Sequence, residues 1–304
     1  MLLLFEQLLN GFQYGITLFL LAAGLTLIFG VMGVINLAHG SIFMIGAYAG
    51  TWTSLTTGSF LIGIVAALIC AAIAGALIEF CVIRQLYKRN HLDQVLATFA
   101  LILIANQGIT LIFGRQPLNG FMPEMLNGTI ALLPGFHYPL YRFIVILSGI
   151  AVVIGLYLLM TYTRIGMLIR AGSTNRNMVR ALGINVNMLY TFAFALGALL
   201  AGFAGFITSP LGSVQVGMGE QILITTFVVV VVGGLGSIKG AFVAAIIVGL
   251  FDTLLRSYLP DFLRLMMEGP DADALSSGLS SMGIYILMAI VLLLRPAGIL
   301  GSKS

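Results

Sequence analysis

Long stretches without a charged residue alternate with short polar segments along the whole chain. The longest uncharged run covers residues 7–78, and shorter runs cover residues 94–114, 143–163, 181–219, 221–238 and 274–294. A helix that crosses the roughly 30 Å apolar core of a bilayer needs about 20 mainly apolar residues. This pattern therefore predicts a series of membrane-spanning helices joined by short polar turns.

The runs divide into individual spans at glycine-rich or polar turns. We predict spans at 8–30, 36–56, 60–83, 94–114, 140–162, 187–208, 221–237, 240–259 and 279–294, which gives eight or nine crossings. The span 221–237 is short and ends in Gly233-Gly234-Leu235-Gly236, so a re-entrant piece or half of a broken helix is an alternative. The predicted fold is an all-α polytopic membrane protein, formed by a single transmembrane domain over residues 1–304.

Composition excludes the main classes of water-soluble protein. Of 304 residues, 60% are hydrophobic and 8% are charged, and the mean hydropathy is +1.11. A soluble domain of this length would carry about 25% charged residues. These values argue against a soluble enzyme, a disordered chain or a nucleic-acid-binding protein. Cys70 and Cys81 have neither the spacing of a metal site nor that of a disulfide framework.

The basic residues predict how the chain is oriented in the membrane. Loop 84–92 holds Arg84, Lys88 and Arg89, loop 163–186 holds four arginines, and the C-terminal tail holds Arg295 and Lys303. Alternating spans place all of these on one side, whereas loop 260–278 on the other side is mainly acidic. Because cytoplasmic loops are enriched in Lys and Arg, we expect a periplasmic N-terminus and a cytoplasmic C-terminus. The first residues lack a basic n-region, so they do not resemble a cleaved signal peptide.

Three groups of polar or glycine residues interrupt the apolar sequence and are candidates for the permeation path or its gate. In the first, Asn36 is suited to cap the following helix, and ionisable groups such as His39 within spans usually face an interior or a wet cavity. Span counting puts this bend near the cytoplasmic side, so a gate or an ATPase-facing role is as plausible as substrate contact. The candidate pathway and gate residues are Asn36, His39, Ser41, Asn106, Gln107, Gly233 and Gly234.

Each of these groups also has a purely structural interpretation. The glycines around 233 suit a helix that breaks at membrane depth, where free backbone groups must line a cavity or be buried in protein. The amides of Asn106 and Gln107 can simply hydrogen-bond between helices. Gly197, Ala201 and Gly205 recur every four residues, which is typical of close helix packing in membranes.

The remaining charged residues in spans are explained by local pairing. Asp252 and Arg256 are spaced i, i+4, which favours an intrahelical ion pair, and Glu79 is expected to snorkel or to pair with a basic neighbour. The sequence has no Ser/His/Asp set, no HExxH motif and no carboxylate pair within a span, so an intramembrane enzyme is unsupported.

Loop 163–186 is longer than a simple connection requires. Within it, Ser173 or Thr174 can cap a short helix that runs to about Leu182, with Gly183 as its stop. One face of this helix would carry a small apolar ridge formed by Met178, Ala181 and Leu182, and Arg176 and Arg180 would form a basic face. Such a ridge contacts either lipid headgroups or a groove on a soluble partner. The size of the ridge fits a groove on a soluble partner better than it fits lipid headgroups.

Several sequence blocks together resemble the permeases of the bacterial high-affinity branched-chain amino-acid ABC importers, and among them the LivH type. The Asn-Leu-Ala-His-Gly block is fairly specific, whereas the loop block alone is weaker, and the resemblance extends over nearly the whole chain. The stretch 171–177 lacks the acidic residue often found in such coupling loops. The blocks are residues 33–40, 46–48, 170–171, 180–185, 233–237 and 240–241.

The resemblance implies an inner-membrane subunit that works with a second permease, two cytoplasmic ATPases and a periplasmic binding protein. The chain would then be neither an enzyme nor the holder of a cofactor, and it has no Gly-x-x-x-x-Gly-Lys-Ser/Thr loop of its own. Loops 115–139 and 260–278 would meet the binding protein. The residues expected to couple to the ATPases are Arg170, Asn175, Arg176, Met178, Arg180, Ala181, Leu182 and Gly183.

Other transport functions remain open at the level of sequence. A urea or short-amide importer permease shares the same blocks, and neither the Asn36/His39 region nor Asn106-Gln107 distinguishes an amino acid from urea. A self-sufficient channel or ion-coupled carrier would transport its solute without a motor. A membrane scaffold would cause no transport defect when deleted.

Overall fold

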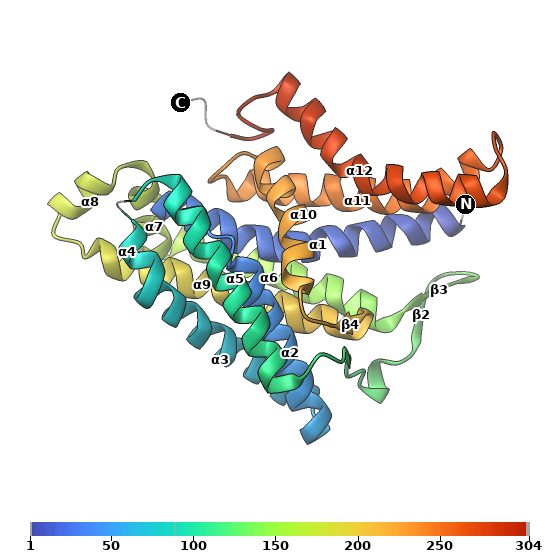
Figure 1. Ribbon diagram of the computed structural model, residues 1–304, viewed down its shortest axis with the longest axis horizontal. Coiled ribbons are helices and arrows are strands. Elements are labelled where there is room, and N and C mark those ends of the chain that lie inside the picture. Colours follow the sequence, from blue (N-terminus) through green and yellow to red (C-terminus); the bar gives the residue numbers. More distant parts are fainter. Residues whose placement is uncertain (1, 88, 302–304) are drawn as a thin grey trace.

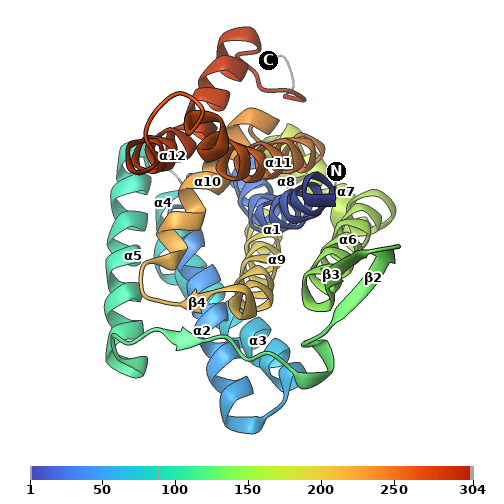
Figure 2. The same cartoon turned by 90° about the vertical axis from the view of Figure 1, so that its right-hand side faces the viewer.

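Two helices form the centre of the bundle. The computed structural model describes residues 2–87 and 89–301. The longest helix, α1 (Leu2–Met32), is buried over most of its length and packs against α9 (Val186–Thr208). The end-on view in Figure 2 shows both helices surrounded by the others. Residues of these two helices therefore supply much of the apolar core.

The first half of the chain contributes one side of the bundle. Helix α2 (His39–Thr57) turns at Gly58 into α3 (Phe60–Ile78), which continues through the π-helical turn η1 (Glu79–Ile83) into the short α4 (Arg84–Leu86). Helix α5 (His91–Phe113) then returns along the outside. Ser59 and Asn90 cap α3 and α5 by accepting backbone N–H groups.

The segment after α5 is built from short strands rather than from helix. It contains β1 (Leu118–Asn119), the 3-10 turn η2 (Glu124–Leu126), and the hairpin formed by β2 (Thr129–Leu133) and β3 (Phe136–Pro139). Tyr138 of the hairpin is fully buried and its hydroxyl donates to the side chain of Asn10 at 3.1 Å. The hairpin therefore folds over the first part of α1.

The second half repeats the alternation of helices and turns. Helix α6 (Leu140–Tyr162) leads into α7 (Arg164–Thr174) and α8 (Arg176–Ala181), and α9 follows them. After the turn η3 (Ser209–Leu211), strand β4 (Ser213–Val214) pairs with β1. The chain then forms α10 (Met218–Gly233), α11 (Ile238–Leu263) and α12 (Gly269–Leu294).

The helices agree with a polytopic membrane protein. Among the described residues, seven helices are long and apolar enough to cross a bilayer. Two further segments that the sequence predicts as spans also form helices, namely α2, which is rich in Gly, Ser and Thr, and α10, which has only 16 residues. Helix α10 ends at Gly233, at the start of the Gly233-Gly234-Leu235-Gly236 stretch that the sequence predicts as a helix break.

One predicted loop is mostly helical. The sequence predicts a loop at residues 260–278, whereas α11 continues through Pro260 to Leu263 and α12 begins at Gly269. Pro270 lies in the first turn of α12, where its missing N–H would have no helical partner in any case. Charged residues in this region therefore lie mainly on helix ends, where Arg264 pairs with Asp273 at 2.9 Å.

Glycine allows the central helices to approach each other closely. A Cβ atom on Gly24 would lie 2.8 Å from the carbonyl oxygen of Gly197, and one on Gly46 would lie 2.4 Å from the Cα of Gly202. The predicted small-residue face of α9 is thereby confirmed as a packing surface against α1 and α2. Without a hydrophobic drive between helices in lipid, such close backbone contact is a main source of association.

The two ends of the bundle differ in character. In Figure 1, α4, α7 and α8 gather at one end, and the N-terminal part of α1, the β2–β3 hairpin and the α11–α12 connection lie at the other. We call them the basic end and the hairpin end. Lys88 and Lys303, which contribute to the predicted orientation, lie outside the described residues.

Candidate functional site

The chain breaks its helical path directly after α1. Gly33 adopts a left-handed conformation with φ of 66°, and residues 33–38 carry the chain back towards the bundle before α2 begins at His39. The Asn36 side chain accepts the N–H of Ala38 at 3.0 Å, which closes a turn. Asn36 therefore stabilises the turn before α2, whereas the sequence predicted it as the helix cap itself.

His39 lies deeper in the bundle than span counting suggests. Its ring is fully buried, and its Nε2 atom is 2.8 Å from the position that a Cβ on Gly24 would occupy. Gly24 lies well inside α1 and contacts Gly197 at the middle of α9. The bend at residues 33–38 follows directly after the end of α1, and His39 reaches the level of Gly24 because the chain after Gly33 folds back along α1. Neither ring nitrogen has a side-chain or backbone hydrogen-bond partner among the described residues.

The first turn of α2 packs against the start of α10. A Cβ on Gly40 would lie 2.1 Å from the carbonyl oxygen of Gly219, so the two backbones are in direct contact. Ser41 beside it is buried. The first turn of α10 therefore lies directly beside the buried His39 and Ser41.

A second polar group lies on α5, next to the same turn of α10. Asn106 donates to the carboxylate of Glu220, and Gln107 beside it is exposed. Together they border an open groove of about 570 Å³, which we call the α5 groove. Its lining residues are Leu103, Asn106, Gln107, Thr110, Arg115 and Val216.

Glu220 belongs to this site but is not among the residues predicted from the sequence. A signal for it exists, because Glu220 alone separates the uncharged runs 181–219 and 221–238. An ionisable residue between two spans usually has a partner or a function. Its partner on α5 is the side-chain amide of Asn106, which the sequence already predicts as a pathway residue.

Gly233 and Gly234 lie at the opposite end of α10. Gly233 contacts the backbone of Gly240, and a Cβ on Gly234 would lie 2.6 Å from Gly301. The N–H groups of Ile299 and Leu300 donate to the carbonyls of Val232 and Gly233 at 2.8 and 3.2 Å. The structure therefore brings Asn106 to the same turn of α10 as Gly40, with Gln107 beside Asn106 in the α5 groove, but it does not bring Gly233 and Gly234 there.

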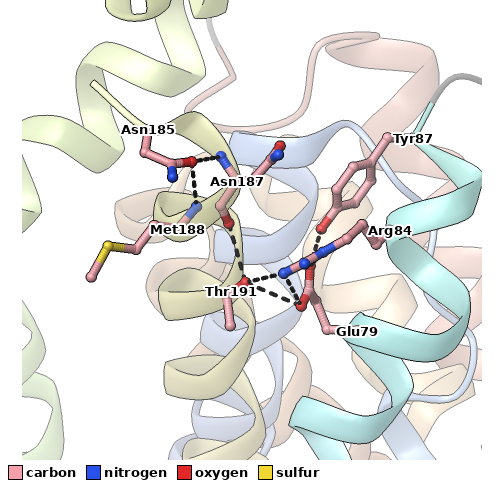
Figure 3. Close-up of polar contacts among 7 residues, drawn as sticks. All are labelled: Glu79, Arg84, Tyr87, Asn185, Asn187, Met188 and Thr191. Carbon is pink, nitrogen blue, oxygen red and sulfur yellow. Dashed lines mark hydrogen bonds and ion pairs between the residues drawn. The ribbon is translucent and has the colours of Figure 1, made fainter. Parts of the chain in front are cut away.

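A buried carboxylate connects α3, α4 and α9 at the basic end. Arg84 donates to both oxygens of Glu79, from Nε at 3.3 Å and from Nη2 at 3.2 Å, and the Tyr87 hydroxyl donates to Oε1 at 2.6 Å. Thr191 of α9 accepts a hydrogen bond from Arg84 and lies 3.1 Å from Glu79 Oε2. Figure 3 shows these side chains converging on Glu79. The expected pairing of Glu79 with a basic neighbour is confirmed.

This cluster, which we call the Glu79 network, occurs on an irregular helix. Glu79 begins the π-helical turn η1, and single π turns inside helices are frequent at functional sites. Burial raises the pKa of Tyr87 above its ordinary value of 10.0, and the hydrogen bond to Glu79 and its negative charge raise the pKa further. The phenol therefore stays protonated and keeps donating to Glu79.

The predicted coupling loop folds into two short helices. Thr163 caps α7 and Asn175 caps α8, each by accepting an N–H three residues on. The short helix is thus confirmed, but its cap is Asn175, because Ser173 and Thr174 are the last residues of α7 and donate to the carbonyl of Arg170. Gly183 ends the segment with φ of 78°, as its predicted role as a stop requires.

The apolar ridge of α8 faces away from the bundle. Met178 is 61% exposed and Leu182 is 71% exposed, and Ala181 and Arg180 are exposed as well. Val179, which the sequence analysis does not name, is buried and anchors α8 to the bundle. Arg170 borders a cavity beside α1, and the side chain of Arg176 lies outside the described residues.

The charged groups in the spans form local pairs and no metal centre. Arg256 donates to Asp252 at 2.9 Å within α11, which confirms the predicted intrahelical pair. Among the described residues, no three His, Cys, Asp or Glu side chains come together as a metal site would require.

Comparisons with known proteins agree over almost the full length of the chain. A family model described as "Branched-chain amino acid transport system / permease component" matches residues 7–292. The chain is 27% identical to the high-affinity branched-chain amino acid transport system permease protein LivH of Escherichia coli K12, over 97% of this chain and 95% of that protein.

Two further relatives also cover most of the chain. It is 30% identical to the probable branched-chain amino acid transport permease protein LivH of Methanocaldococcus jannaschii, over 95% of this chain and 90% of that protein. It is also 28% identical to the ribose import permease protein RbsC of Escherichia coli K12, over 90% of this chain and 79% of that protein. No solved structure matches the chain significantly.

Proposed function

Because the chain belongs to the family of branched-chain amino acid transport system permease components, we propose that it forms part of the path by which branched-chain amino acids enter the cell through an ATP-driven importer. It is a multi-pass protein of the inner membrane, with seven helices long and apolar enough to cross it. The chain itself is a non-catalytic subunit that binds no cofactor, and ATP is hydrolysed by partner subunits.

The α5 groove is the best-supported wall of the path. Helix α5 is an apolar span, yet it exposes the amide of Gln107, and Asn106 is held by Glu220 from α10. A polar group facing lipid in the membrane core would lack the hydrogen bonds that water supplies, which is costly. A second permease that packs against this face would enclose the groove and give a passing solute polar contacts on an otherwise apolar surface.

The buried His39 and Ser41 lie behind that wall and can act as its gate. They lie beside the first turn of α10, which carries Glu220, so a shift of α10 would change the packing at Gly40 and the hydrogen bond at Asn106 together. Gly233 and Gly234 are at the far end of α10 and would serve as its hinge. The single observation that carries this proposal is the contact of α10 with both polar groups.

The exposed ridge of α8 is the proposed docking site for an ATPase, with Arg170 and Asn175 through Gly183 forming the coupling segment. The basic end would then face the cytoplasm and the hairpin end the periplasm, in line with the excess of Lys and Arg in cytoplasmic loops. The β2–β3 hairpin and the α11–α12 connection would receive the binding protein.

The test is uptake of leucine into liposomes that contain the chain together with its second permease and ATPases. We expect uptake only with ATP inside and with loaded binding protein outside. The variant Gln107→Leu should lower the uptake rate about tenfold, because a lost polar contact is worth roughly 1 kcal/mol or slightly more. The matched control is Gln221→Leu, since Gln221 is also exposed but does not line the groove.

Two results would contradict the proposal. Leucine uptake by the chain alone would show that no motor is required. Equal uptake by Gln107→Leu and Gln221→Leu, both at the rate of the unmodified chain, would remove the α5 groove from the path.

A further inference from the structure

One large cavity lies away from the proposed path. It opens sideways between α6 and α11, has a volume of about 640 Å³, and has α1 as its floor. We call it the lateral groove. The floor residues are Phe19, Thr26, Leu27 and Gly30.

The walls of the lateral groove are apolar and open to the membrane. Ile154 and Tyr157 of α6 are each 52% exposed, and Val243 of α11 is 37% exposed. Both helices are long and apolar enough to span a bilayer. A cavity with such walls, at membrane depth, faces the acyl chains of lipid rather than water.

The end of the groove that lies towards α7 is different, because it is basic and hydroxylic. Arg170 of α7 and Lys239 of α11 both border this end and are exposed, and within the described residues neither has a carboxylate within 4.0 Å. Ser237, which also borders it, accepts the N–H of Gly240 at 3.1 Å, so its hydroxyl hydrogen is free to donate to another group. The groove therefore combines an apolar trough with two uncompensated positive charges at one end.

We propose that the lateral groove binds one anionic phospholipid, with an acyl chain along α1 and the phosphate held between Arg170 and Lys239. The two cations lie at the basic end of the bundle, which suits the headgroup level of an anionic leaflet. A long Lys side chain can follow the apolar wall and still present its ammonium group at that level. A protein partner would need a carboxylate at the same point on an otherwise apolar segment.

The binding site goes beyond the proposed transport function and can be tested without it. The purified chain is incubated in detergent with equal amounts of phosphatidylglycerol and phosphatidylcholine, and the bound lipid is quantified by native mass spectrometry. We expect phosphatidylglycerol to bind preferentially. Lys239→Ala and Arg170→Ala should each weaken its binding about fivefold, because a basic residue near an anionic surface contributes about 1 kcal/mol.

A matched control separates the groove from general attraction to a basic surface. Arg164 is exposed at the start of the same helix as Arg170 but does not border the groove, so Arg164→Ala should leave binding unchanged. The variant Ile154→Trp should occupy the groove and lower phosphatidylglycerol binding while all cations remain. A phosphatidylglycerol with a photoreactive acyl chain should label Leu27, Ile154 or Val243.

Three outcomes with the purified chain, and one in the assembled complex, would overturn the proposal. These are equal binding of the two lipids, an Arg164→Ala effect as large as that of Lys239→Ala, and photolabelling confined to α3, α5 and α12, which would indicate only the general lipid shell. In the assembled complex, an Ile154→Cys variant that crosslinks to the second permease would show that protein, and not lipid, fills the groove.

Discussion

Glu79 shows how a single charge can be accommodated deep in an apolar bundle. Its side chain is 1% exposed, yet both oxygens receive hydrogen bonds, two from Arg84 and one from Tyr87. Burying a carboxylate without such partners would destabilise the fold by far more than the ion pair with Arg84 stabilises it. The network thus fixes α4 against the start of α9, the helix that follows directly after α8.

Removing one donor of the Glu79 network should destabilise the folded chain. We expect Tyr87→Phe to lower its stability by about 1–3 kcal/mol, because Oε1 of Glu79 loses a hydrogen bond in a buried setting. The measurement is the thermal unfolding midpoint in detergent. Tyr162→Phe is the control, since Tyr162 is 74% exposed. Equal midpoints for the two variants would show that the Tyr87 hydroxyl contributes nothing.

The contact partner of a side chain could be predicted when that partner is close in sequence, and less well when it is far away in the chain. The Asp252–Arg256 pair follows from its spacing, and Arg84 lies five residues after Glu79. The partner of Asn106 is Glu220, which is 114 residues away, and the contact of His39 with Gly24 depends on the chain folding back. Such contacts depend on tertiary packing, which local spacing does not encode.

Among the elements, α8 has the clearest expected role outside the bundle. Its exposed side chains Met178 and Leu182 form an apolar ridge, and the buried Val179 holds the helix in place. A ridge of this size on a surface helix matches helix-in-groove recognition by a partner protein.

A charge on this ridge should detach the motor without unfolding the bundle. We expect Leu182→Arg to reduce co-purification of the ATPases more than about tenfold, because it would bury an unpaired charge in an apolar groove. Gel filtration of the variant permease should remain unchanged. The control is Met125→Arg, since Met125 is 91% exposed at the hairpin end. Intact ATPase complexes with full transport from Leu182→Arg would refute the coupling assignment.

Helix existence was easier to predict than helix ends. The apolar run alone indicates α5 and α6, and Gly183 marks the stop after α8 because its φ is positive. Several residues before α8 could cap a helix, and the structure selects Asn175 because α7 extends through Thr174. Helix α7 was not predicted, because it lies in the segment 163–186 that was assigned as a loop and because it is amphipathic rather than apolar.

At the scale of the whole molecule, the asymmetry between the basic end and the hairpin end predicts the orientation in the membrane. In a background with Cys70→Ala and Cys81→Ala, we expect Thr129→Cys to react with an impermeant maleimide added outside intact spheroplasts. Thr174→Cys should react only after the membrane is opened. Both positions are exposed, one in β2 and one at the end of α7. The reverse labelling pattern would invert the proposed topology.

The overall architecture was largely predictable because lipid imposes simple rules. Every span must satisfy its backbone internally, so uncharged runs become helices. The sequence does not specify which helix is central, since α1 and α12 are both apolar but only α1 is buried on most sides. The α5 groove and the lateral groove arise from that arrangement, and neither could be located from the order of residues.

The pairing of residues 299–300 with the end of α10 has a consequence for biogenesis. Within the part of the chain that the structure describes, the carbonyls of Val232 and Gly233 accept the N–H groups of Ile299 and Leu300, in the tail that follows α12. During translation α10 leaves the ribosome and enters the membrane before that tail has been synthesised. The last carbonyls of α10 therefore lack these partners at first, and they stay close to water or to the insertion machinery. Their hydrogen bonds form only after α11 and α12 have been inserted and residue 300 has been synthesised.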